Sequence, residues 1–145
     1  MRRWLPFWPV GFGLLLLASC GVEPETGPGK VSWDRDTCER CQMAISDLSF
    51  ATQLRTSDGH LHRFDDVGCA LIWERDQDAD VTEVWVRELE GDAWLDGHDA
   101  RFVKVRNSPM GYGYGARSTA PEGLDLMKLR EQILVMEDER RRPAQ

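Results

Sequence analysis

The sequence lacks most of the patterns that mark an enzyme or a nucleic-acid-binding protein. It carries 25 acidic and 18 basic residues, and an acidic chain of this kind is a poor nucleic-acid binder. Serine, histidine and aspartate fall into no recognisable catalytic arrangement, and acidic runs such as 76–80 have the composition of a solvated turn. The glycine-rich stretch 110–115 lacks the G-x-G-x-x-G spacing of a phosphate loop. We therefore expect a binding protein that is not an enzyme.

A membrane-spanning segment is also missing, because the apolar run 10–17 is too short to cross a bilayer. Two arginines precede this run, so residues 1–19 have the character of an export signal. Residues 17–21 (Leu-Ala-Ser-Cys-Gly) resemble the lipobox of bacterial lipoproteins, which implies cleavage before Cys20 and acylation of its sulfur. The alternative is an ordinary secretory signal with a free Cys20. Attachment to a membrane would depend on the acyl chains, because an acidic protein is not drawn to anionic lipid.

The chemistry of the sequence gathers in residues 37–43, Thr-Cys-Glu-Arg-Cys-Gln-Met. Cys38, Cys41 and Met43 place two thiols and a thioether so close together that their sulfurs can converge on one point in a loop. Soft sulfur ligands select soft cations, and this set suits Cu(I) better than Mg²⁺, Ca²⁺ or Mn²⁺. We interpret the motif as a copper site.

Other uses of a Cys-x-x-Cys motif stay open: a disulfide, part of a zinc site, or a redox dithiol. Zinc would need further ligands from Cys69 or from His60 and His62. Cys69 is expected to be a buried core thiol. The spacing from Cys38 to His62 is not that of a zinc finger. The two histidines share one side of a predicted strand and are candidate auxiliary ligands. A thioredoxin-like dithiol should open a helix after a strand, yet little strand-like sequence precedes Cys38. Met43 favours Cu(I), because zinc rarely uses a thioether.

The predicted elements indicate an α+β fold with two small, similar ββαβ units after the signal and a flexible tether. Proline and glycine mark residues 20–36 as the tether. In the first unit, 37–91, an Asp-Gly pair predicts a hairpin, and Asp65 or Asp66 caps a helix. Its expected elements are strands 50–56 and 60–64, a helix at 67–75 and a strand at 81–89.

The second unit is expected over residues 92–138, ahead of a frayed tail at 139–145. Alternating residues predict its strand, and Thr-Ala-Pro-Glu at 119–122 is a capping box that predicts the start of a helix. Its expected elements are a strand at 100–106, a helix at 121–131 and a short strand at 133–136.

Together these features resemble the NosL-type copper lipoproteins of the nitrous-oxide reductase system. The resemblance rests on the lipobox, the Cys-x-x-Cys-x-Met motif, Phe-Asp at 64–65 before a helix, and Pro-Met-Gly at 109–111. It covers roughly residues 15–136. It implies an α+β fold and delivery of Cu(I) in the periplasm for assembly of the copper-sulfur centre of nitrous-oxide reductase. The implied partners are the apo-reductase and the ABC-transporter assembly complex that accompanies it.

Position by position, Cys38, Cys41 and Met43 match the N-terminal motif of that family, and Met110 matches the methionine of its Pro-Met-Gly. Met110 is then a releasable fourth ligand or a sulfur on the docking side. Family members commonly have glycine where this chain has Gln42. Two thiolates and a thioether leave Cu(I) under-coordinated, so a partner's ligands can displace it.

The residue after the lipobox cysteine bears on location. Gly21 resembles the second residue of lipoproteins sorted to the outer membrane, which predicts an anchored protein that faces the periplasm. That compartment is oxidising, so Cys38 and Cys41 without a metal would tend to form a disulfide.

Overall fold

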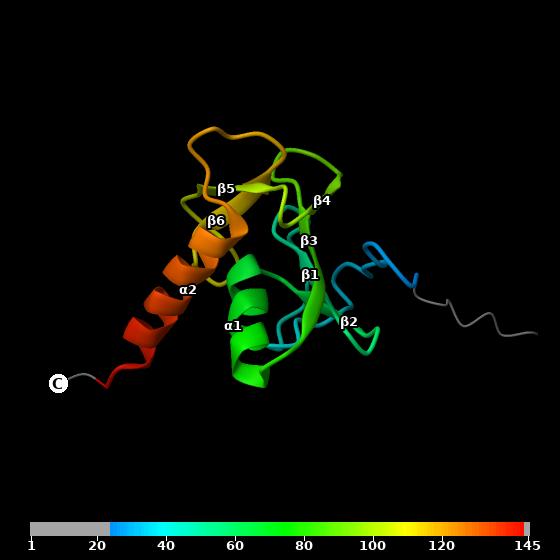
Figure 1. Cartoon of the computed structure of the whole chain (residues 1–145), viewed down its shortest axis with the longest axis horizontal. Helices are drawn as coiled ribbons and strands as arrows, with labels where there is room; N and C mark the ends of the chain where they lie inside the picture. Colours follow the sequence, from blue (N-terminus) through cyan, green and yellow to red (C-terminus); the bar gives the residue numbers. More distant parts are fainter. Residues whose placement is uncertain (1–23, 144–145) are drawn as a thin grey trace, which may run out of the picture.

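The computed structural model describes residues 24–143, so the predicted signal and Cys20 lie outside the described residues. The chain has an α+β fold, as expected (Figure 1). Within the described range a four-stranded antiparallel sheet has the order β2-β1-β3-β4, and a two-stranded sheet pairs β5 with β6. The elements are β1 (Thr52–Thr56), β2 (Leu61–Phe64), α1 (Val67–Gln77), β3 (Val81–Arg87), β4 (Trp94–Asp96), β5 (Arg101–Lys104), β6 (Tyr114–Arg117) and α2 (Leu126–Arg141).

β1 lies at the centre of the first sheet and is buried along its whole length, including its polar residues. Gln53 donates to the carbonyl of Gly29 and accepts from its N–H, at 3.0 and 2.8 Å. Arg55 donates to the carbonyl of Gly27 at 2.7 Å. These bonds satisfy polar groups that would otherwise be costly to bury. Residues 27–29, part of the expected tether, are therefore held against the sheet.

α1 begins where a carboxylate meets the positive end of the helix. Asp66 is the N-cap, with extended backbone angles, and its side chain accepts the N–H of Gly68 at 2.8 Å. Asp78 ends the helix in a left-handed conformation, with φ of 50°. The apolar side of α1 packs on the sheet, and its opposite side meets α2, so α1 lies between the two (Figure 1). The first four predicted elements are present in the predicted order, with ends shifted by a few residues.

The second half departs from the prediction after β5. β4 follows the boundary expected near residue 91, yet it pairs with β3 and extends the first sheet. The predicted helix start at 121 is wrong, because α2 begins at Leu126 with Asp125 as its N-cap. The predicted strand at 133–136 is also wrong, because these residues continue α2 and bury Ile133 completely. The expected ββαβ order includes a second strand before this helix but gives it no residues, and the structure has β6 there, in and just after the glycine-rich stretch.

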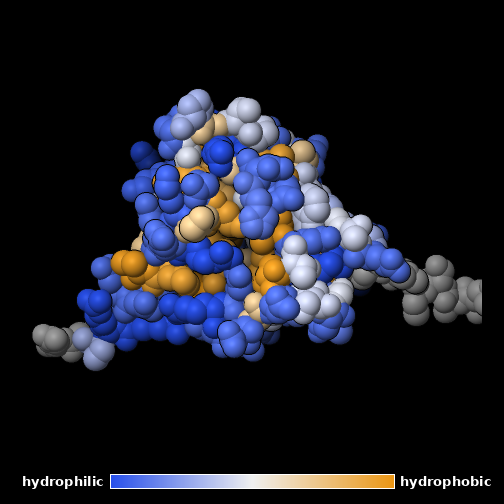
Figure 2. Space-filling model, in the orientation of Figure 1, coloured by the Kyte–Doolittle hydropathy of each residue, from blue (hydrophilic) through white to orange (hydrophobic). Residues whose placement is uncertain are grey.

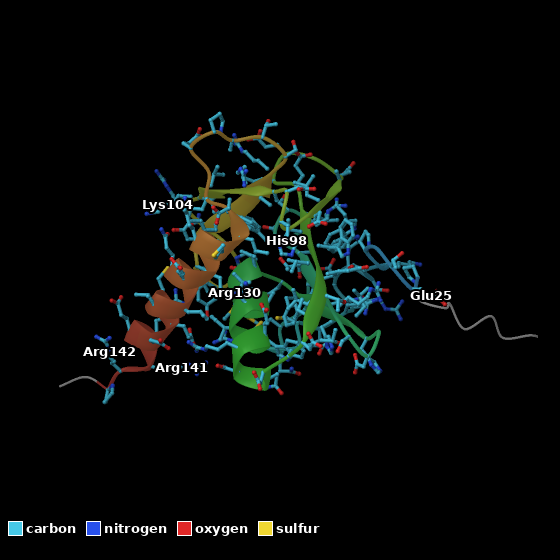
Figure 3. All side chains as sticks on the ribbon, in the orientation of Figure 1. Glu25, His98, Lys104, Arg130, Arg141 and Arg142 are labelled. Carbon is cyan, nitrogen blue, oxygen red and sulfur yellow. The ribbon has the colours of Figure 1, made fainter. Side chains whose placement is uncertain are left out.

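Ion pairs join the far ends of the two helices. Arg141, labelled in Figure 3, lies near the end of α2. It donates to Asp76 of α1 at 2.5 Å and to Glu137 at 2.9 Å. The hydrogen bond from Arg141, with that from Arg75, lowers the pKa of Asp76. Burial alone would raise the pKa of Glu137, but hydrogen bonds from Arg141 and Tyr112 outweigh it and lower that pKa.

These lowered pKa values predict that the fold loses stability in acid. A carboxyl whose pKa is lower in the folded state stabilises the fold above its unfolded value and loses that contribution as the pH falls through the folded value. The free energy of unfolding should therefore drop as the pH falls below the ordinary values of 4.5 and 3.8 for glutamate and aspartate. Urea unfolding at several pH values measures the drop, and it should be smaller in Arg141→Gln. An equal drop in both proteins would contradict the assignment.

Apolar side chains also reach the surface. Figure 2 shows an apolar patch over α2 within a charged surround, and Met127 and Val135 of this helix are exposed. Within residues 24–143, neither helix is long and apolar enough to cross a membrane.

Candidate metal centre

The Cys-x-x-Cys-x-Met motif folds as a tight loop. An isolated antiparallel bridge joins Thr37 to Ala44 and closes the loop at its base. Inside it, the N–H of Cys38 donates to the carbonyl of Met43 at 2.8 Å, and the N–H of Gln42 donates to the carbonyl of Cys38 at 2.9 Å. The loop therefore turns the Cys38 side chain into the protein, where it is fully buried.

The turn depends on Gln42, which has a positive φ of 64°. Glycine adopts this conformation without the penalty that a Cβ brings. Gln42→Gly should therefore keep the free energy of unfolding equal or raise it by up to ~1 kcal/mol, whereas Gln42→Val should lower it by ~1–2 kcal/mol, because β-branched residues resist positive φ. Urea unfolding of the three proteins tests the order. A valine variant as stable as the glycine variant would contradict it.

Three sulfurs and one carboxylate converge beside this loop. One ligand atom each from Cys38, Cys41, Asp65 and Cys69 lies within 4.8 Å of the others, and we call these four residues the Cys₃Asp cluster. Cys41 is half-buried and the other three are buried. The loop supplies two of the cysteines, the β2–α1 junction supplies Asp65, and the first turn of α1 supplies Cys69.

Hydrogen bonding and burial give the three thiols of the cluster different pKa values. The Cys69 thiol donates to the Cys38 sulfur, and this bond lowers the pKa of Cys38 to about 7 despite burial. The same bond raises the pKa of Cys69, because its proton is held between the two sulfurs. Burial raises the pKa of Cys41 to about 12. The cluster thus offers one sulfur that ionises near neutral pH and two thiols that a metal would have to deprotonate.

Asp65 is the buried member of the cluster whose carboxylate lacks part of its hydrogen bonding within the described residues. Its side chain is 3% exposed, and Oδ2 accepts a hydrogen bond from the Cys41 thiol at 3.3 Å. Oδ1 has no hydrogen-bond partner within the described part of the chain. A buried carboxylate oxygen without a partner is costly, and a bound cation would satisfy it.

Asp66, the next residue, ties the Pro-Met-Gly loop to the same junction. Its Oδ2 accepts the Ser108 hydroxyl at 2.6 Å and the Met110 N–H at 3.1 Å. Gly111 and Gly113 both have positive φ, and between them Tyr112 turns inward to 3% exposure. The glycine-rich stretch therefore brings the Pro-Met-Gly loop next to the start of α1.

The two predicted thioether ligands lie at the outer side of this arrangement. Met43 is 54% exposed and lines an open pocket of about 350 Å³ together with Asp65, Ser108 and Pro109. Met110 is half-buried against the core. The pocket thus joins the motif loop to the Pro-Met-Gly loop, and coordination by Met43 and Met110 stays a prediction.

His60 and His62 are not among the four residues of the Cys₃Asp cluster, and both have partners of their own. His60 Nδ1 pairs with the Asp58 carboxylate at 3.0 Å in the exposed hairpin turn. His62 contacts the Glu39 carboxylate through Nδ1 at 2.7 Å and the Thr56 hydroxyl through Nε2 at 3.1 Å. Coordination of the metal ion by these two histidines stays a prediction.

Sequence reasoning did not assign two members of the cluster to the site. Cys69 is buried, as expected, but its thiol lies at the cluster and not only among core side chains. The sequence indicates Asp65 as a possible helix cap and as part of the Phe-Asp pair, not as a metal ligand, and in the structure Asp66 is the cap. The spacing i, i+4 from Asp65 to Cys69 across a helix start was the available signal, because it places both side chains near one helix end.

The fold and the cluster define a class: a small α+β domain with a soft-donor cluster of the kind that holds metal ions. Among solved structures, the crystal structure of the copper chaperone NosL from Shewanella denitrificans has this fold, with a TM-score of 0.57 and 20% sequence identity. The match covers 75% of this chain and 88% of that one, and it shows that this chain has a NosL-like fold. No protein-family model matches the chain, and no curated protein matches it in sequence.

Proposed function

We propose that this protein is a Cu(I)-binding chaperone without enzymatic turnover. The observation that carries the proposal is the convergence of three cysteine sulfurs, because three thiolates form a soft, low-coordinate site of the kind that Cu(I) prefers. Cys38, Cys41 and Cys69 are the ligands in this account. The NosL-like fold supports the same interpretation, since one solved structure with this fold is that of a copper chaperone.

We propose delivery rather than storage because the site is closed on one side only. Cys38 and Cys69 are fully buried, whereas Cys41 is half-buried and Met43 lies at the surface pocket. A partner's ligands can therefore reach the copper ion from the Cys41 side. We infer that the receiving protein is apo nitrous-oxide reductase, reached with the help of its ABC-transporter assembly complex. The protein would face the periplasm from the outer membrane, anchored through acylated Cys20.

A structural zinc module is the second candidate, and Asp65 is the observation that favours it. Three thiolates and a carboxylate make the four ligands that a closed tetrahedral zinc site needs. Asp65 Oδ1 has no partner among residues 24–143, and this carboxylate oxygen suits a ligand to Zn²⁺ better than an extra ligand to Cu(I). Zinc binding would stabilise the fold and would not require exchange with a partner.

A thiol-disulfide oxidoreductase fits the geometry less well. In a thioredoxin-like site the Cys-x-x-Cys motif opens a helix, which lowers the pKa of the attacking thiol. Here the motif lies in a closed loop, and the nearest helix in the described chain begins at Val67. The raised pKa of Cys41 also disfavours a reactive thiolate on the half-buried, more accessible side.

The test is an anaerobic competition on the whole reduced protein. Cu(I) is offered from a chromophoric Cu(I) chelator and Zn²⁺ from a zinc chelator, and the metal-loaded protein is then mixed with apo nitrous-oxide reductase. We expect one Cu(I) per chain, a preference for Cu(I) over Zn²⁺, and transfer to the reductase. Met43→Ala should weaken Cu(I) binding less than Cys38→Ser or Cys41→Ser. A protein that holds zinc in preference, or no metal, would overturn the proposal.

A further inference from the structure

The middle of the Cys-x-x-Cys motif carries a cation that reaches the metal centre. Arg40 lies between the two motif cysteines, and its Nη1 donates to the Cys69 sulfur at 3.9 Å. Its Nη2 donates to the Glu137 carboxylate of α2 at 2.6 Å. The guanidinium therefore joins the cluster on one side to α2 on the other.

The surroundings hold this guanidinium in place. Its side chain is only 20% exposed and its carbon Cζ lies 6.0 Å from the centre of the Tyr112 ring. Glu137, which is 8% exposed, also accepts the Tyr112 hydroxyl at 3.0 Å and Arg141 at 2.9 Å. Arg141 also pairs with Asp76, so Glu137 is not its only carboxylate partner. The Arg40 guanidinium directs one nitrogen at Glu137 and the other at the Cys69 sulfur, and this geometry places its positive charge beside the cluster.

A fixed cation at this place acts differently on different metals. A monovalent ion in a three-thiolate site leaves one more negative charge than a divalent ion does. A nearby positive charge stabilises the more negative complex more strongly, and partial burial limits solvent screening. We infer that Arg40 is a positioning residue that acts through Cys69 and biases the Cys₃Asp cluster toward monovalent Cu(I) over divalent Zn²⁺. This inference rests on the proposed function, because it concerns the selectivity of the same site.

The alternative is a purely structural role, in which Arg40 only anchors the motif loop to α2. That role would weaken Cu(I) and Zn²⁺ binding to the same extent, because a loosened loop misplaces the same thiols for either ion. The ratio of the two affinities therefore separates the roles. The chain offers a matched control in Arg130, which is labelled in Figure 3. Arg130 joins α2 to Glu74 of α1 at 2.7 Å and makes no hydrogen bond to a cysteine within residues 24–143.

The experiment measures Cu(I) and Zn²⁺ affinities by chelator competition on the whole reduced protein and on Arg40→Gln, Arg40→Lys and Arg130→Gln. Arg40→Gln should lower the ratio of Cu(I) to Zn²⁺ affinity about tenfold or more. Arg40→Lys should retain most of the ratio, since it keeps the charge, and Arg130→Gln should retain all of it.

An unchanged ratio in Arg40→Gln, with both affinities lowered alike or neither altered, would overturn the inference and leave the proposed function standing. Absence of Cu(I) binding by the unaltered protein would instead overturn the proposed function. Loss of the ratio in Arg40→Lys as large as in Arg40→Gln would also count against a charge effect.

Discussion

Replacing Cys69 by serine should weaken Cu(I) binding as severely as replacing Cys38. Both sulfurs are fully buried in the Cys₃Asp cluster. Each replacement therefore removes one of three soft ligands at a position where water cannot enter to take its place. We expect a loss well beyond the roughly 10–100-fold that accompanies removal of an outer contact of a metal ligand. Anaerobic competition with a chromophoric Cu(I) chelator measures the loss.

The control for this prediction is Ala70→Ser, which adds a hydroxyl at the next, equally buried position of α1 and removes no sulfur. That variant can lose stability, but its Cu(I) affinity should stay near that of the unaltered protein once it is folded. If Cys69→Ser binds Cu(I) no more weakly than Ala70→Ser, Cys69 is a core thiol and not a ligand.

Asp66→Ala should cost ~3–7 kcal/mol of unfolding free energy, a large part of the stability of a small domain. The carboxylate is fully buried and accepts three hydrogen bonds, from Gly68, Ser108 and Met110. Alanine removes the N-cap of α1, worth ~1 kcal/mol, and leaves two more donors without a partner, at ~1–3 kcal/mol each. Urea unfolding measures the loss.

The matched control is Asp125→Ala at the N-cap of α2. Asp125 accepts one exposed N–H, from Lys128 at 2.9 Å, so its loss should lower the free energy of unfolding much less than the loss of Asp66. Asp66→Asn should fall between the two alanine variants, because the amide oxygen can still cap the helix. Equal costs for the two alanine variants would show that the bonds to the Pro-Met-Gly loop contribute nothing.

Local patterns in the sequence predicted the first half of the fold well. The Asp-Gly hairpin and the carboxylate before α1 are local signals, and local hydrogen bonds in the structure satisfy them. The helix at residues 126–141 was mispredicted because Thr119 and Glu122 mimic a capping box, while the actual cap is Asp125. The prediction of a strand at 133–136 was wrong because it followed the strand preference of Ile and Val. In the structure, burial of Ile133 against the core outweighs that local preference, and the segment is helical.

The candidate site was predictable only in part, for a similar reason. The close spacing of Cys38 and Cys41 in one loop predicts that their sulfurs converge, and the structure places both sulfurs together. The i, i+4 spacing places Asp65 and Cys69 near each other, but only the packing of α1 on the sheet brings this pair to the two loop cysteines, and no local pattern encodes that long-range relation. The same holds for Arg40, whose partner Glu137 lies near the end of the chain.

X-ray absorption at the copper edge of the anaerobic, Cu(I)-loaded protein tests the central claim most directly. The account predicts one Cu(I) per chain with a shell of sulfur neighbours that loses one sulfur in each of Cys38→Ser, Cys41→Ser and Cys69→Ser. A shell dominated by nitrogen or oxygen, or a sulfur shell that survives all three replacements unchanged, would contradict it.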